Sequence, residues 1–76
     1  MASARDNFVR LAEARTKKVL KDLDLLGNLS NRSNYAYSEE DVKTIFKAVS
    51  KRMHDVELRF KASMTATREA DFRLPR

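Results

Sequence analysis

The 76-residue sequence has no cysteine, no tryptophan, one glycine, one proline and one histidine. Without cysteine the chain forms neither disulfides nor thiolate metal sites, so two common supports of small folds are missing. The scarcity of glycine and proline disfavours a turn-rich β-sandwich or barrel. No apolar run is long enough to span a bilayer, and the first ten residues lack the apolar stretch of a secretion signal. We therefore expect a small cytoplasmic protein with no membrane contact.

What the sequence does contain is a balance of 42% hydrophobic and 36% charged residues. This balance is too apolar for a disordered chain. At this length it supports one domain over residues 1–76 with a small core. Stability must then come from well-packed helices, from association with a second copy, or from both.

A first helix is predicted over residues 4–26, because apolar or small side chains recur there at alternating steps of three and four residues. They are Val9, Ala12, Thr16, Val19, Leu23 and Leu26, with Leu20 on the flank. Gly27 follows directly, and we predict that it takes the left-handed conformation that often ends a helix. A polar connector rich in asparagine and serine is expected over residues 27–37.

The start of a second helix is the most specific local signal in the sequence. Ser38 is placed as an N-cap, with Glu39, Glu40 and Asp41 in the first turn, where carboxylates complement the helix dipole. Asp41 is three residues after Ser38, the spacing of a shortened capping box. Tyr37 and Val42 flank this cap at the spacing of a hydrophobic staple. This helix is predicted over residues 39–65, because Thr65 and Thr67 then lower the helix propensity. Residues 66–76, which contain Pro75, are expected to form a tail, with a frayed continuation of the helix as the alternative.

The second helix carries its own apolar stripe, with steps of four and three residues. Its members are Val42, Phe46, Val49, Met53, Val56 and Phe60, with Ile45 on the flank. We predict an all-α fold in which the two helices form an antiparallel hairpin. Near the connector, each helix carries more apolar surface than one partner helix can cover. We therefore expect two hairpins to pair as a homodimeric four-helix bundle. The predicted core and dimer residues are Val19, Leu20, Leu23, Leu26, Val42, Ile45, Phe46, Val49, Met53, Val56 and Phe60.

Arrangements of residues that could perform catalysis are nearly absent from the sequence. With His54 as the single histidine and no cysteine, one chain cannot build a Cys–His pair or a two-histidine metal site. A single glycine also excludes the glycine-rich loops that bind nucleotides. We therefore expect no enzyme activity, no cofactor, no bound metal and no small-molecule substrate.

The net charge is +5, and residues 1–34 carry seven basic against four acidic side chains. We define the N-terminal basic face as Arg10, Lys17, Lys18 and Lys21. Together with Arg32, this face is a candidate site for the phosphates of a nucleic acid. The alternative is a solvated helix face whose long side chains cover apolar surface.

The connector is the second candidate contact site, because Arg32, Tyr35 and Tyr37 are residue types that anchor interfaces. The alternative is a packed connector in which the tyrosines cover the end of the bundle. In that case the asparagines form local turns through their own side chains.

The block LDLLGNLSNRSNYAYSEEDVKTIFKAV, residues 23–49, resembles a group of short uncharacterised bacterial proteins, some of them carried on mobile elements. The shared pattern is LGNLSN, followed by tyrosine or threonine positions and then DVxxIF. The resemblance covers about a third of the chain. It implies a compact hairpin, and it transfers no activity and no site residue.

Taken together, the sequence predicts a small non-enzymatic module that associates with itself. Its basic N-terminal face and connector would engage nucleic acid or an acidic nucleoprotein partner. The alternative is a module that acts by protein–protein contact alone, for example by blocking a host complex. In that alternative the positive charge serves solubility.

Overall fold

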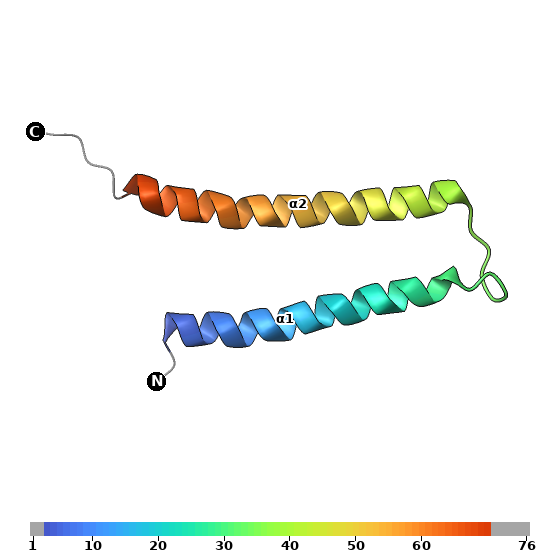
Figure 1. Ribbon diagram of the computed structural model, residues 1–76, viewed down its shortest axis with the longest axis horizontal. Helices are drawn as coiled ribbons and strands as arrows, with labels where there is room; N and C mark the ends of the chain where they lie inside the picture. Colours follow the sequence, from blue (N-terminus) through green and yellow to red (C-terminus); the bar gives the residue numbers. More distant parts are fainter. Residues whose placement is uncertain (1–2, 71–76) are drawn as a thin grey trace, which may run out of the picture. The chain divides into compact units, whose positions relative to one another are not determined.

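A computed structural model of the chain describes residues 3–70, with side chains described over 3–65. In this part of the chain the elements are α1 (Ala4–Gly27), a short 3-10 turn η1 (Asn28–Ser30) and α2 (Glu39–Ala70) (Figure 1). The described residues contain no strand, so the all-α prediction is confirmed. The chain divides into two units, Met1–Ala36 and Tyr37–Arg76, and each is described by itself.

The first helix begins with a capping box that the sequence analysis did not identify. The Asp6 amide donates to Ser3 Oγ at 3.0 Å, and the Ser3 amide donates to Asp6 Oδ2 at 3.2 Å. Two backbone amides that a helix start leaves without intrahelical partners are thereby satisfied. The signal was present in the sequence, because Ser3 and Asp6 have the same spacing as Ser38 and Asp41.

The end of α1 corrects the prediction for Gly27. This residue is helical, with φ −60° and ψ −30°, and no described residue has the positive φ of a left-handed cap. The reason is that the helical bonding continues past it, since the Asn28 amide donates to the Asp24 carbonyl. The chain leaves helical geometry at Asn31, whose ψ is 102°. The first residues of the predicted 27–37 connector are therefore helical.

Asn31 organises the turn that follows. Its side-chain Oδ1 accepts from the Ser33 amide at 2.9 Å. Its carbonyl accepts from the amides of Asn34 at 3.1 Å and Tyr35 at 3.0 Å. The first of these bonds is the local asparagine turn expected for a packed connector.

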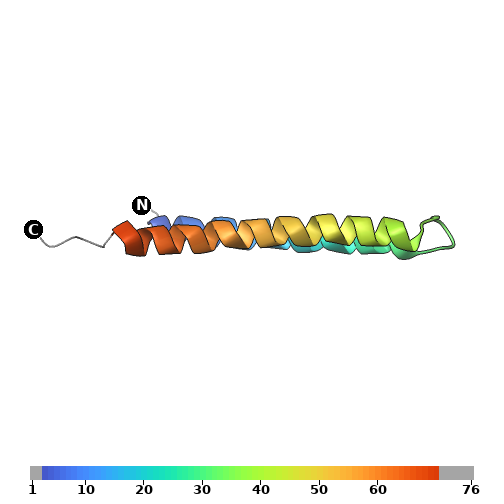
Figure 2. The same cartoon turned by 90° about the horizontal axis from the view of Figure 1, so that it is seen from above.

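The second helix begins at its predicted capping box. The Ser38 amide donates to Asp41 Oδ2 at 2.9 Å, and the Asp41 amide donates to Ser38 Oγ at 3.1 Å. Glu39, Glu40 and Asp41 occupy the first turn as expected. Figure 2 shows α2 as one continuous helix, and it extends to Ala70, five residues beyond the predicted end at 65. The rest of the predicted tail, with Pro75, lies outside the described residues.

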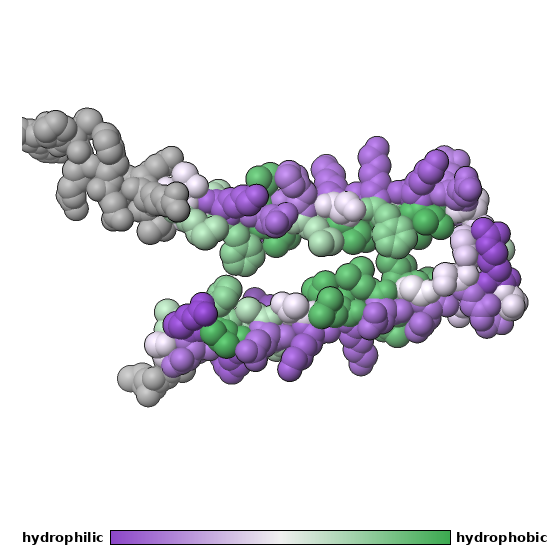
Figure 3. Space-filling model, viewed as in Figure 1, coloured by the Kyte–Doolittle hydropathy of each residue, from purple (hydrophilic) through white to green (hydrophobic). Residues whose placement is uncertain are grey.

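Both helices separate apolar from polar side chains. In Figure 3 the hydrophobic colour gathers mainly on one side of α1 and on one side of α2, and most of the remaining visible surface is hydrophilic. This is the arrangement that a 3.6-residue repeat produces from steps of three and four. Over the described residues, neither helix combines the length and the apolarity needed to cross a lipid bilayer.

Candidate interaction surfaces

The apolar stripe of α1 is accessible along its whole length, and no residue of this helix is buried. Val9, Ala12, Leu23 and Leu26 are half-buried, and they are the innermost side chains of the helix. Val19 is 54% exposed, although it lies within the same stripe. The free energy is lowered when another surface covers large apolar side chains that are this exposed.

The stripe of α2 is still more exposed. Val49 is half-buried, whereas Phe46 is 52% and Met53 60% exposed. The remaining predicted core residues of this helix are also exposed, namely Val42, Ile45, Val56 and Phe60. An isolated helix cannot bury its own stripe, so both stripes are apolar surfaces available for packing.

Only three of the four residues of the N-terminal basic face lie on the same side of α1. Arg10, Lys17 and Lys21 lie within about 40° of one another around α1, opposite the apolar stripe. Lys18 lies about 100° from Lys17, on a different side of the helix. The structure thus brings three of the four predicted residues into one line and leaves Lys18 apart.

Carboxylates accompany each of the three aligned cations. Asp6 precedes Arg10 by four residues, Glu13 precedes Lys17 by four, and Asp24 follows Lys21 by three. Residues at these spacings are neighbours on a helix surface. The line of positive charge on α1 is therefore accompanied by an equal number of negative charges.

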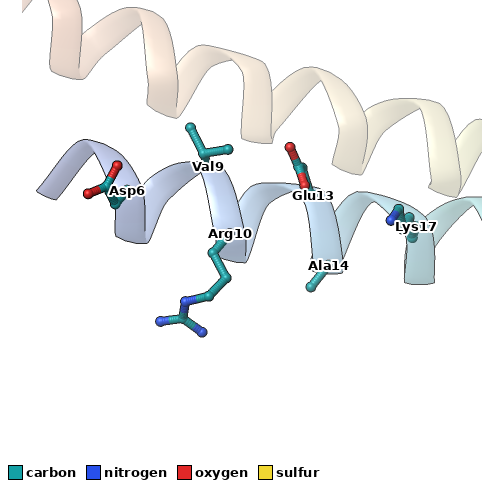
Figure 4. Close-up of a pocket in the computed structure, with 6 residues that line it drawn as sticks. All are labelled: Asp6, Val9, Arg10, Glu13, Ala14 and Lys17. Carbon is teal, nitrogen blue, oxygen red and sulfur yellow. The ribbon is translucent and has the colours of Figure 1, made fainter. Parts of the chain in front are cut away.

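A shallow open hollow lies along this part of α1. Its lining consists of Asp6, Val9, Arg10, Glu13, Ala14 and Lys17, all from the one helix (Figure 4). Arg10 and Glu13 point in opposite directions from the helix in this view. Nothing in α1 encloses the hollow, so it lacks the concave shape of a small-molecule pocket.

Arg5, which also belongs to the basic N-terminal segment, lies on another side of the helix. Its guanidinium carbon is 5.8 Å from the centroid of the Phe8 ring, within the range of a cation–π contact. By its position on the helix, Arg5 lies on the apolar side of α1, away from the line of Arg10, Lys17 and Lys21.

Sequence reasoning overlooked a second line of positive charge, on α2. We define the lysine ridge as Lys43, Lys47 and Lys51, which follow one another at steps of four residues and are all exposed. They occupy the side of α2 that faces away from the apolar stripe, with Lys47 about 140° from the stripe centre. The signal in the sequence was the four-residue repeat of lysine.

The connector residues are accessible. Arg32 is exposed and Tyr35 is 48% exposed, both in the turn that Asn31 organises. Tyr37 is half-buried and directly precedes the cap of α2. Its predicted staple with Val42 remains a prediction.

Titratable side chains do not gather into a metal site within the described residues, where no three histidine, aspartate or glutamate side chains are close enough to hold an ion. His54 is exposed on α2, on the same side as the lysine ridge.

Comparisons with protein-family models, with curated proteins and with solved structures found no match to this chain. The resemblance of residues 23–49 to short bacterial proteins therefore remains a prediction.

Proposed function

We propose that this chain is a non-enzymatic helical module that acts by association. In this proposal the stripes of α1 and α2 pack against each other as an antiparallel hairpin, and two hairpins pair as a four-helix bundle. The basic outer surface then engages nucleic acid or an acidic nucleoprotein. The observation that carries the proposal is that two long helices present continuous apolar stripes while α1 buries none of its residues.

The hairpin is supported by the short connection between the helices. After η1, residues 31–38 lead directly into the cap of α2. Connections of this length usually join helices that are antiparallel neighbours. A hairpin of this kind still leaves part of each stripe accessible, because the stripes carry flanking residues such as Leu20 and Ile45. A second copy offers the same apolar surface and is the simplest partner.

Contact with nucleic acid is supported by charge. The net charge of +5 attracts a polyanion, and two exposed sets of cations lie on helix sides away from the stripes, namely Arg10, Lys17 and Lys21 on α1 and the lysine ridge on α2. Because the connection between α1 and α2 is longer than the three- or four-residue turn of a helix–turn–helix, backbone contact is the expected mode of binding.

The second candidate is a module that contacts proteins alone, with its charge serving solubility. The exposed Tyr35 and the half-buried Tyr37 favour this candidate, since tyrosine is enriched at protein interfaces. Here Arg32 and the two tyrosines would be the contact residues.

Two measurements test the proposal. Light scattering coupled to size-exclusion chromatography should give twice the 8.8 kDa mass of one chain at micromolar concentration. A monomer under these conditions would contradict self-association. Titration of the protein into short DNA and RNA at increasing salt should show affinity that falls steeply with salt concentration. Absence of binding at about 50 mM salt would remove the nucleic-acid contact and leave the protein-contact candidate.

A further inference from the structure

We propose that two copies of this chain meet through their α2 helices, which lie side by side and antiparallel across a two-fold axis at the height of Lys51. This inference rests on the proposed function and deepens it, because it assigns the contact between the two hairpins to one helix and gives that contact a direction and a register.

The apolar stripe of α2 alternates strictly between valine and a larger side chain. Its larger members are 52–60% exposed, whereas two of its valines are 36–37% exposed and the third, Val49, is half-buried. This side of the helix therefore presents a row of projections separated by recesses. In chain order the members are Val42, Phe46, Val49, Met53, Val56 and Phe60.

Two such stripes fit each other in one relative direction. When two α2 helices lie antiparallel with both Lys51 residues at the same height, every layer of the contact joins one valine with one larger side chain, as close packing requires. A parallel pair in register would place valine on valine and phenylalanine on phenylalanine, which leaves some layers underfilled and others crowded. The antiparallel layers are Val42 with Phe60, Phe46 with Val56, and Val49 with Met53, each formed between one copy and the other.

The length of the stripe selects the register. From Val42 to Phe60 the stripe extends over about 27 Å of the helix, and its midpoint is Lys51. A shift by one heptad would keep the match of sizes but would leave two stripe positions of each copy without a facing stripe residue. The unshifted register therefore buries the most apolar surface.

Charges beside the stripe agree with this direction. Lys43 lies about 100° and Glu57 about 60° from the stripe centre, on the same side of it. The two-fold axis at Lys51 brings Lys43 of each copy next to Glu57 of the other, which is an attractive pair. Glu39 and Glu40 also neighbour Lys43 on its own helix, so the pair between copies favours the direction more than it strengthens the contact.

On the opposite side of the stripe, Arg52 lies near Arg52 of the other copy, close to the axis. Asp55 follows Arg52 by three residues and supplies a carboxylate beside each guanidinium. The like charges on this side are thus compensated within each helix.

The stripe of α1 lacks this alternation. Its first half carries the small Ala12 and Thr16, and it ends with Leu23 and Leu26. A stripe that grades from small to large has no regular projections to define a register. In the proposed bundle, α1 therefore covers the part of the α2 stripe that faces its own hairpin, and α2 provides the two-fold contact.

The test introduces cysteines into the full chain, which has none of its own to compete. In the proposed register, position 46 of one copy faces position 56 of the other. Identical positions of the two copies are then about 15 Å apart along the axis, as are positions 46 and 56 of one helix, and a disulfide cannot span that distance. The variants are Phe46→Cys, Val56→Cys and the double variant Phe46→Cys/Val56→Cys, each checked for its dimer mass by light scattering before oxidation.

A second measurement leaves the stripe intact, because the loss of Phe46 removes apolar contacts. Spin labels are attached to Ser50→Cys and, in a separate variant, to Lys61→Cys, both at exposed positions of α2. The two Ser50 positions lie within about 3 Å of each other along the axis, whereas the two Lys61 positions are about 30 Å apart. Pulsed electron paramagnetic resonance measures the distance between the labels in each dimer.

We expect oxidation to convert most of the double variant into a species of twice the 8.8 kDa mass on a non-reducing gel, and to leave both single variants uncrosslinked. Crosslinking by a single variant, or a label distance at Lys61 no longer than that at Ser50, would indicate parallel helices and overturn this inference while self-association stands. A double variant that stays dimeric but forms no crosslink would also overturn it, because the two α2 helices would not be adjacent. A monomeric wild-type protein would overturn both this inference and the proposed self-association.

Discussion

Ser38 and Asp41 each bind the backbone amide of the other, at 3.1 Å to Ser38 Oγ and 2.9 Å to Asp41 Oδ2. This reciprocal pair satisfies two amides at the start of α2 and places a carboxylate at the positive end of the helix dipole. Ser3 and Asp6 repeat the arrangement at the start of α1, at 3.0 and 3.2 Å. The start of each helix is therefore defined locally, by a serine and an aspartate three positions apart in the sequence.

Removing a cap should destabilise the protein measurably. We expect Ser38→Ala to lower the free energy of unfolding by about 1 kcal/mol, because the Asp41 amide loses its acceptor. Ser3→Ala should have a similar effect through Asp6. Urea unfolding followed by circular dichroism at one protein concentration measures the change.

The matched control for the cap is Ser50→Ala, an exposed serine inside α2. It should leave stability unchanged or raise it by a few tenths of a kcal/mol, since alanine has the higher helix propensity. Equal effects of Ser38→Ala and Ser50→Ala would show that the capping bonds contribute nothing.

The helical conformation of Gly27 predicts that alanine is an improvement there. Gly27 has φ −60°, and nothing lies within 4 Å of a Cβ placed on it. We expect Gly27→Ala to raise the free energy of unfolding by about 0.5–1 kcal/mol, because glycine loses more backbone entropy on folding. Thermal unfolding measures it, with Ala14→Gly in the same helix as the reverse change. A destabilised Gly27→Ala variant would indicate a left-handed glycine in solution.

Two leucines of α1 lie on different sides of the helix, and comparing them tests whether the apolar stripe is the packed side. Leu23 is half-buried in the stripe, and Leu25, two residues later, is 54% exposed on the other side. If the stripe packs in a bundle, Leu23→Ala should cost about 2–4 kcal/mol, whereas Leu25→Ala should cost less than about 0.5. Denaturant unfolding of both variants at equal concentration decides the matter, and equal costs would exclude this face as the packed one.

A similar pair on α2 tests self-association directly. Met53 and Leu58 are 60% and 46% exposed, and they lie about 140° apart around the helix. Met53→Lys should dissociate the proposed dimer, because a charge cannot be buried in the stripe without a partner. Leu58→Lys should leave the dimer mass unchanged. Light scattering on both variants is the measurement, and a dimer that survives Met53→Lys would place the interface elsewhere.

Much of the secondary structure could be predicted because its causes lie close together in the chain. The alternating steps of three and four residues predicted both helices, and the Ser38–Asp41 spacing predicted where the second one starts. The cap at Ser3 was equally local and was overlooked although its signal was present. The helix α2 continues to Ala70, beyond the predicted end at 65 and as the alternative of a continued helix expected, because Thr65 and Thr67 lower helix propensity without preventing a helix.

The candidate sites were less predictable. The sequence analysis placed positive charge on the first helix by counting basic residues over 1–34, and that count ignores which neighbour each cation has. Spacing on the helix surface shows that Asp6, Glu13 and Asp24 accompany the α1 cations. On α2, Glu39 and Glu40 accompany Lys43 and Asp55 accompanies Lys51. Charge excess along a chain is therefore a poor guide to charge excess on a surface.

The sequence alone determined that this protein is helical, where its two apolar stripes lie, and how the second helix is capped, since each depends on side chains within a few residues of one another. Only the three-dimensional structure decided that Gly27 stays helical, because glycine adopts right- and left-handed conformations about equally readily and the bond from Asn28 to Asp24 selects one. The structure also decided which lysines share a side of α2, because that depends on an uninterrupted helix from Glu39 onward.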